Sequence, residues 1–592
     1  MASIRGTHGL VAYRYRGRYY TEMSRFDRDL DILGLRVIKE VPLEPTAYKK
    51  WLKDKREHYA MLEAQQDDGI FTMKADVDDD TDMTRRLWSE TFRTQSMLRL
   101  HAMVVGSTII VNLDAEVLTM QYSAHFNLAD FPRRSAQWLN AIKPSIYQEY
   151  PTLSLDFCER KQMGEPAAAR RAPKFLKDGT AATRVVPKSD LHSGRDVFLA
   201  HAIAKVFRTY HRSITRFGLE WERDSFVLRE LVFAIVSIAS GEADFSSAVC
   251  TRQYCFPGIE ENDTGVHVDW QRPCFENGEL GTLEPLATFD TFYHRKGQAP
   301  GAAPGQYLYW MKGVVINICT TVDGEAIEEA IVWGRKQGRE AFQIIVMSIY
   351  QICFAEVHAG SDKRDVIRYS DPIHLSPLRA EECMALHPLA RPQSTAEAGM
   401  SMTEGERVIS CNSFGTSPRL KKHYPGLVAL VNFFKVAVIR MAPPQSASTL
   451  PPEILARIMS YTDNETHGAC MKASQTLCSF GFDELPLTDE YRIVSKPEVM
   501  RSRSNANTSP ERGLLALRFV NKHDGKTCTM VQVTSTNGWG LRTWTPLIGH
   551  RERRVLMTDV FLTFTPSDDH ERDEDGADSD VSYLECDDDS NY

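Results

Sequence analysis

The residues of this sequence that could bind a metal or carry acid–base chemistry are few and widely spaced. Cys250, Cys255, His267 and Cys274 could offer thiolate and imidazole ligands, which are groups that zinc prefers. The gaps between them are four, eleven and six residues, and these do not match a standard zinc finger. Four separate structural residues is the plainer interpretation, so we expect no metal site and no cofactor.

A second candidate is an acid–base cluster around His8, which stands between Thr7 and Gly9. The groups that could join it lie far along the chain: Asp27, Asp114, Glu116 and His125. A histidine beside glycine at a strand start more often holds a turn, so a catalytic N-terminal region is kept only as an alternative. The acidic run 76–82 lacks the central glycine and terminal glutamate of a calcium loop, and we interpret it as a solvated loop.

Common enzyme motifs are absent from the sequence. It contains no Gly-x-x-x-x-Gly-Lys-Ser/Thr loop, no Gly-x-Ser-x-Gly elbow, no His-Glu-x-x-His and no Gly-x-Gly-x-x-Gly. Whether the chain is an enzyme therefore stays open, and the residues favour a protein without catalysis of its own.

The elements expected at the N-terminus form an α+β domain over residues 1–158. Apolar and aromatic residues alternate from Val11 to Tyr19 around Gly17, which predicts a hairpin. Helical spacing of aromatic residues from Pro45 to Gln66 predicts an amphipathic helix packed on it. The segment 101–117 predicts two strands joined at Gly106.

A basic, alanine- and proline-containing segment over residues 159–190 is interpreted as a linker, with nuclear import as the less favoured function. A central α/β or α+β domain is expected over residues 191–441. It begins with helical periodicity from Phe198 to Phe217 and the apolar segment Phe226–Ser240. Further on, strand, helix and strand patterns over 307–321, 325–337 and 341–357 predict a β-α-β unit.

Charge divides the chain into a body and a tail. The 592 residues carry a net charge of −9, but residues 567–592 hold twelve carboxylates and one arginine. The other 566 residues therefore carry +2. We expect an extended, solvated tail at 567–592, after a β-rich extension over residues 486–566.

Composition excludes several classes of protein. The apolar runs are too short, or too interrupted by charge, for the roughly 18 to 20 residues that span a bilayer, and the N-terminus has no signal-peptide core. Twelve scattered cysteines suit a reducing compartment, so the cytosol or nucleus is expected. Nucleic-acid binding is disfavoured, because alternation on a strand from Tyr13 to Tyr19 would put tyrosines on a packed face and arginines on a solvated one.

A short helix with a broad apolar face follows the polar segment 442–449. Leu450-Pro451-Pro452-Glu453-Ile454-Leu455 resembles the opening of an F-box, and Ala469 to Leu477 stands where that family has its second helix. The resemblance covers residues 449–485 and implies a helical module that docks onto the adaptor of a cullin-type ubiquitin ligase. His467 and Gly468 stand where the family has leucines. The implied anchor residues are Leu450, Pro451, Ile454, Leu455 and Ile458.

The N-terminal segment Gly6-Thr7-His8-Gly9-Leu10 and its hairpin resemble a family of fungal proteins of unknown function, many with a late F-box-like segment. Segments 112–116 and 125–128 are similar to later parts of that family. The expectation is a non-catalytic, multidomain α+β F-box-like protein that acts as a substrate receptor or scaffold. Its partners would be a cullin-ligase adaptor and an unknown substrate protein; packing of the helical module on its own chain is the alternative.

Overall fold

The computed structural model describes the chain in segments. These are residues 9–24, 30–67, 93–95, 107–120, 124–129, 181–248, 287–289, 301–359, 365–386, 403–410, 417–444, 450–462, 464–481, 484–487, 491–500, 514–533, 541–550, 553–557 and 559–567. The zinc-ligand candidates, the acidic run 76–82 and the acidic tail beyond Ser567 lie outside them. The predicted mixed α+β class is confirmed, with helices and three sheets in the described segments.

The N-terminal sheet is built on the predicted hairpin. β1 (Gly9–Tyr15) and β2 (Arg18–Ser24) pair antiparallel, and β4 (Ser107–Asn112) lies parallel to β1 on its other side. β5 (Val117–Met120) and β6 (Ala124–Asn127) follow by antiparallel pairing, while β3 (Arg93–Gln95) extends the β2 edge. Of the two strands predicted over 101–117, the second is β4; the first lies outside the described residues.

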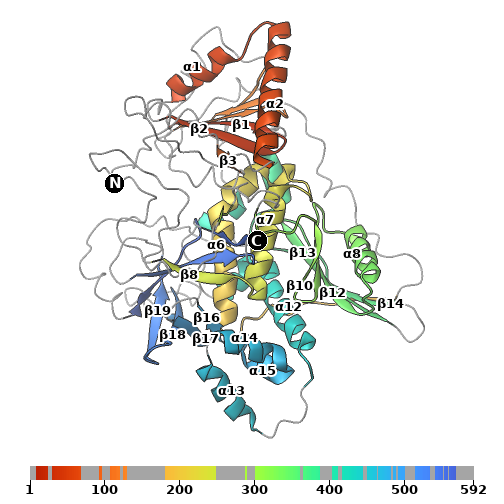
Figure 1. The fold of residues 1–592 in the computed structure, drawn as a ribbon, viewed down its shortest axis with the longest axis vertical. Coiled ribbons are helices and arrows are strands. Elements are labelled where there is room, and N and C mark those ends of the chain that lie inside the picture. Colours follow the sequence, from red (N-terminus) through yellow and green to blue (C-terminus); the bar gives the residue numbers. More distant parts are fainter. Residues whose placement is uncertain are drawn as a thin grey trace, which may run out of the picture.

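The two faces of this sheet are buried against different partners. α1 (Leu30–Glu40) and α2 (Pro45–Asp67) cover one face, where Val11 and Tyr13 pack with Tyr59. Alternate residues such as Leu10 and Ala12 point to the opposite face and join the core of the central helices. Successive residues of β1 point to opposite faces, and the residues on both faces are apolar, because the sheet is buried on both sides. The sheet lies at the top of the molecule in Figure 1.

The solvated basic face predicted for the hairpin is wrong at Arg14. Its side chain is mostly buried and forms an ion pair with Glu220 of the 3₁₀ helix η3 (Gly218–Glu220), while Asp114 lies 4.0 Å from its Nε. Tyr19 also turns to this face and packs edge-on against Phe217. The prediction failed because strand alternation shows which residues share a face but not what covers that face. Of Arg14, Arg16 and Arg18, only Arg16 has a largely exposed side chain.

The centre of the molecule consists of buried helices. α6 (Gly194–Phe217) and α7 (Phe226–Ser240) match the predicted apolar segments, and α12 (Pro425–Met441) packs against both. Ser193 caps α6 by accepting a 3.1 Å hydrogen bond from the backbone N–H of Asp196. Three short helices complete this layer: α9 (Ala380–Leu386), α10 (Glu404–Ser410) and α11 (Ser417–His423).

The predicted β-α-β unit is present in the central sheet. β11 (Val314–Ile318) and β12 (Phe342–Met347) are parallel and are joined by α8 (Gly324–Lys336), which Asp323 caps. The other strands are β10 (Leu308–Met311), β13 (Gln351–Ala359), β14 (Asp365–Tyr369), β15 (Ile373–His374) and β7 (Ala181–Arg184). Since β7 pairs with β14, residues 181–184, which lie within the predicted linker, belong to the sheet.

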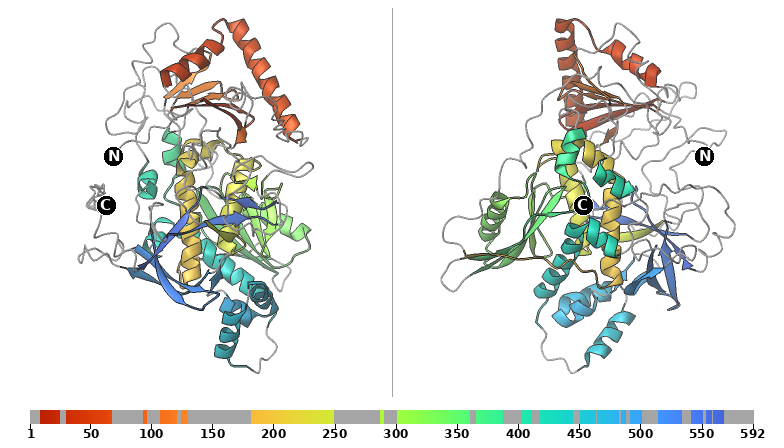
Figure 2. Two further views of the ribbon diagram at one scale, coloured as in Figure 1. Left: turned by 60° about the vertical axis from the view of Figure 1, so that its left-hand side comes forward. Right: turned by 180° about the vertical axis from the view of Figure 1, so that it is seen from behind.

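The C-terminal strands form a third sheet together with strands from the middle of the chain. Its C-terminal members are β16 (Leu485–Pro486), β17 (Tyr491–Met500), β18 (Leu514–Asn521), β19 (Thr527–Gln532), β20 (Arg542–Ile548), β21 (Val555–Leu556) and β22 (Leu562–Pro566). β8 (Asp244–Ala248) pairs with β20, and β9 (Ala287–Thr288) pairs with β21. Figure 2 shows this sheet against the central helices. The strands of the predicted C-terminal extension therefore share a sheet with two strands from the predicted central domain.

Candidate protein-docking site

The segment that resembles an F-box folds into three short helices. They are α13 (Pro452–Tyr461), α14 (Asn464–Ala473) and α15 (Gln475–Gly481), which lie at the bottom of Figure 1. Proline suits the first turn of α13 because its missing N–H would have no intrahelical acceptor there. The carbonyl of Pro451 accepts from the N–H groups of Ile454 and Leu455 at 3.1 and 3.2 Å, and Thr462 closes the other end with a 2.8 Å hydrogen bond to the carbonyl of Met459.

The apolar residues of α13 are divided between two faces. Met459 is buried and Leu455 is half-buried, on the side that meets the rest of the module. Ile454 and Ile458 are each 45% exposed, and Tyr461 is 77% exposed. Positions 454, 458 and 461 share one side of a helix, and Leu450, also 45% exposed, lies just before it. We call these four residues the outer stripe.

α14 and α15 pack on the body of the chain. Cys478 of α15 is fully buried and clusters with Ala442 and with the partly buried Ile439 of α12. The N–H of Gln475 donates a 3.0 Å hydrogen bond to the carbonyl of Pro443. The predicted alternative of packing on the same chain therefore describes α14 and α15, whereas the outer stripe of α13 stays exposed.

His467 fills a position where the resemblance leads one to expect leucine. Its side chain is buried, and burial together with nearby Arg492 and Arg195 lowers its pKa below the usual range. At neutral pH the ring is therefore uncharged and acts as a core side chain. His467 therefore replaces an expected apolar side chain with an uncharged ring in the same buried role.

The five predicted anchor residues are not equivalent in the structure. Leu450, Pro451, Ile454 and Ile458 face solvent, while Leu455 is partly buried. Sequence reasoning missed Tyr461, the most exposed member of the stripe. Its spacing of three residues from Ile458 was the available signal.

The alternative catalytic cluster does not assemble from the described residues. His8, Asp27 and the side chain of His125 lie outside them. The carboxylate of Asp114 accepts hydrogen bonds from the backbone N–H groups of Arg16 and Gly17 at 2.8 and 3.2 Å. Glu116 accepts a 2.9 Å hydrogen bond from the hydroxyl of Tyr48 and lies 3.6 Å from Arg56. Asp114 therefore holds the β1–β2 turn, and Glu116 ties the β4–β5 turn to α2.

A group of residue types suited to nucleophilic catalysis is buried near the end of α6. Cys383 is fully buried, and burial raises the pKa of its thiol to about 12, so it is protonated at neutral pH. Burial also lowers the pKa of nearby His211, whose Nδ1 lies 2.6 Å from the carbonyl of Arg208. Glu406 forms a capping box with Thr403. Cys383, His211 and Glu406 are therefore interpreted as structural residues.

Within the described segments, no three histidine, cysteine, aspartate or glutamate side chains gather as metal ligands. In the same segments no helix combines the length and the apolar character needed to cross a membrane. Comparison of the chain with protein-family models, with curated proteins and with solved structures found no match.

Proposed function

We propose that this chain is a non-catalytic F-box-like protein whose α13 docks onto the adaptor of a cullin-type ubiquitin ligase. In that role it serves as a substrate receptor or scaffold. The observation that supports the proposal is the outer stripe: Leu450, Ile454, Ile458 and Tyr461 remain exposed on a helix whose other apolar face is packed. An amphipathic helix that presents such a stripe fits the groove of a helical partner.

Burial of the outer stripe would contribute part of the free energy of adaptor binding. Fully burying an aliphatic side chain contributes about 1.5 to 3 kcal/mol, so burying the exposed half of each of three such residues contributes about 1 kcal/mol apiece. Tyr461 adds a large surface with a polar tip, the type of residue that dominates many interfaces. α13 packs on α15, which in turn packs on α12, so the helix that carries the stripe is already folded before binding.

The test is binding of the full chain to purified adaptor. Changing Ile454→Asp together with Ile458→Asp places two charges in the interface, and we expect more than a tenfold loss of affinity. Both side chains face solvent, so the fold should be retained. The matched control is Val332→Asp together with Met61→Asp, two exposed apolar residues on α8 and α2. Full adaptor binding by the stripe variant would disprove the proposal, as would equal loss in the control.

The module lies late in the chain, after about 449 residues. A receptor of this arrangement would recognise its substrate through the N-terminal or central region. The surfaces of the N-terminal sheet and its helices are therefore candidates for substrate recognition.

A further inference from the structure

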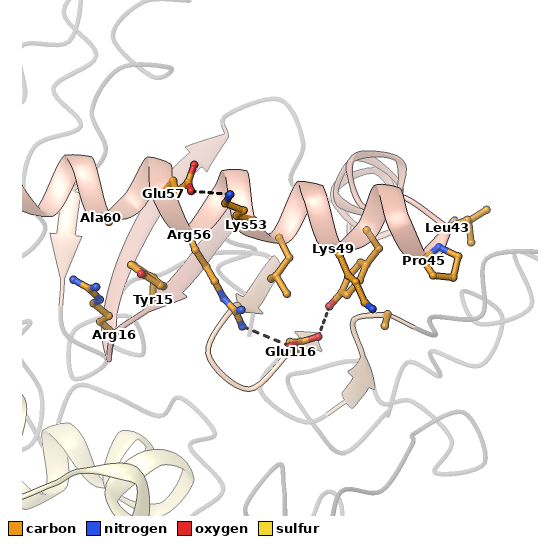
Figure 3. Close-up of a pocket in the computed structure, with 13 residues that line it drawn as sticks. Tyr15, Arg16, Leu43, Pro45, Lys49, Lys53, Arg56, Glu57, Ala60 and Glu116 are labelled. Carbon is orange, nitrogen blue, oxygen red and sulfur yellow. Dashed lines mark hydrogen bonds and ion pairs between the residues drawn. The ribbon is translucent and has the colours of Figure 1, made fainter.

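A groove runs along α2 beside the turns of the N-terminal sheet. Its volume is about 760 Å³, and its floor is formed by α2 together with the β1–β2 turn and Glu116 of the β4–β5 turn. Figure 3 shows Tyr15 and Arg16 at one end and Leu43 with Pro45 at the other. Between them, the side chains of Lys49 and Arg56 point from α2 toward the side on which Glu116 lies.

The groove carries more positive than negative charge. Four of its lining residues are cationic, namely Arg16, Lys49, Lys53 and Arg56, and two are carboxylates, Glu57 and Glu116. Both carboxylates have cationic neighbours: Glu57 lies 3.7 Å from Lys53, and Glu116 lies 3.6 Å from Arg56. Lys49 is exposed and makes no ion pair with any residue that the structure describes. Among the residues that the structure describes, Lys49 is therefore the cation of the groove that has no carboxylate neighbour.

The turn that carries Arg16 has an uncommon conformation for that residue. Arg16 and Gly17 both have positive φ, 49° and 73°, as a two-residue type I′ hairpin turn requires. Asparagine, aspartate or glycine is usual at the first position, and a larger side chain there costs about 1 kcal/mol. Asp114 holds the turn through two backbone hydrogen bonds. The turn therefore places a cationic side chain at this end of the groove despite the cost of the backbone conformation.

The Arg16 side chain is accessible at the mouth of the groove. It is 63% exposed, lies over the ring of Tyr15, and makes only a 3.5 Å contact with Glu63, which Arg18 also approaches at 3.2 Å. At the opposite end Leu43 is 67% exposed. A ligand with several carboxylates and one apolar side chain would satisfy both ends.

We propose that this groove binds an acidic, extended segment of a partner protein. Its carboxylates would pair with Lys49 and Arg16, and an apolar side chain would cover Leu43. A nucleic acid fits less well, because Arg16 already occupies the ring face of Tyr15 and Tyr48 is buried, which leaves no ring for base stacking. The chain's own acidic tail has similar chemistry, and the experiment below distinguishes it from a partner segment.

The inference extends the proposed function by giving it a recognition surface. Binding at the groove needs no adaptor, and adaptor binding through α13 needs no ligand in the groove. The two proposals can therefore fail separately.

The experiment measures binding of a fluorescent peptide of alternating glutamate and leucine to the full chain by anisotropy at physiological salt. We expect Lys49→Glu to weaken binding about fivefold or more, because it reverses a charge inside the groove. Lys50→Glu is the matched control: it makes the same charge change one residue along α2 but lies outside the lining, and its effect should stay within about twofold. Arg16→Asn should also weaken binding while it retains the turn, since asparagine suits positive φ.

Three results would overturn the inference. The first is equal weakening by Lys49→Glu and Lys50→Glu, or no binding at all. The second is that single-stranded RNA binds more tightly than the peptide and that Lys49→Glu weakens this RNA binding. The third is that the chain without residues 568–592 binds the peptide more tightly than the full chain, and that Lys49→Glu abolishes this gain. The tail would then be the occupant of the groove.

Discussion

At the scale of single residues, Glu230 is a buried ionisable group of the described chain. It lies in the second turn of α7 with 1% of its surface exposed, and burial raises the pKa of its carboxyl to about 7. Its Oε1 accepts a 2.7 Å hydrogen bond from the N–H of Ala303, while Arg553 donates to the carbonyls of Gly301 and Ala303. Two side chains thus hold the segment 301–303 in place. A Cβ added at Gly301 would clash with Glu230.

This geometry predicts how stability changes with pH. The pKa of Glu230 is higher in the folded chain than the ordinary 4.5, so the folded state binds its proton more tightly. The contribution of protonated Glu230 to the free energy of unfolding is complete below about pH 4.5 and is lost as pH rises through about 7. Glu230→Gln should therefore raise the free energy of unfolding at pH 8 by about 1 to 3 kcal/mol and change little at pH 5. Urea unfolding at both pH values checks this; equal effects would refute it.

At the scale of elements, the end of α7 is closed by Gly241. Its φ of 71° is left-handed, and its N–H bonds to the carbonyl of Ile238 at 3.0 Å. An added Cβ would clash with the guanidinium of Arg195, a buried residue near the start of α6. We expect Gly241→Ala to lower the free energy of unfolding by about 2 kcal/mol or more, since strain and displacement of a buried cation add. Gly525→Ala, at φ 68° with open space around it, is the control and should cost about 1 kcal/mol.

Elements set by local sequence were predictable, and their partners were not. The hairpin, α2 and the β-α-β unit follow from periodicity and turn residues within short segments. The pairing of Asp244 with Leu547 joins residues far apart in sequence, and no local pattern encodes it. At the candidate site, helical spacing predicted the exposed Ile454 but not that Leu455 would be half-buried, because that depends on how α15 sits beneath α13.

At the scale of the whole molecule, the C-terminal strands complete the core of the centre. Phe564 of β22 stacks on Phe198 of α6 at 6.1 Å, and β8 and β9 pair with β20 and β21. Removing residues 486–592 would expose Phe198 and leave the edges of β8 and β9 without these partners. We expect the shortened chain to lose cooperative thermal unfolding and to be cleaved rapidly by protease, including around α6. Removing only residues 568–592 is the control and should leave the melting temperature unchanged. If the chain ending at residue 485 melted cooperatively near the temperature of the full chain, the C-terminal extension would be an independent unit, and the shared sheet would not contribute to the stability of the centre.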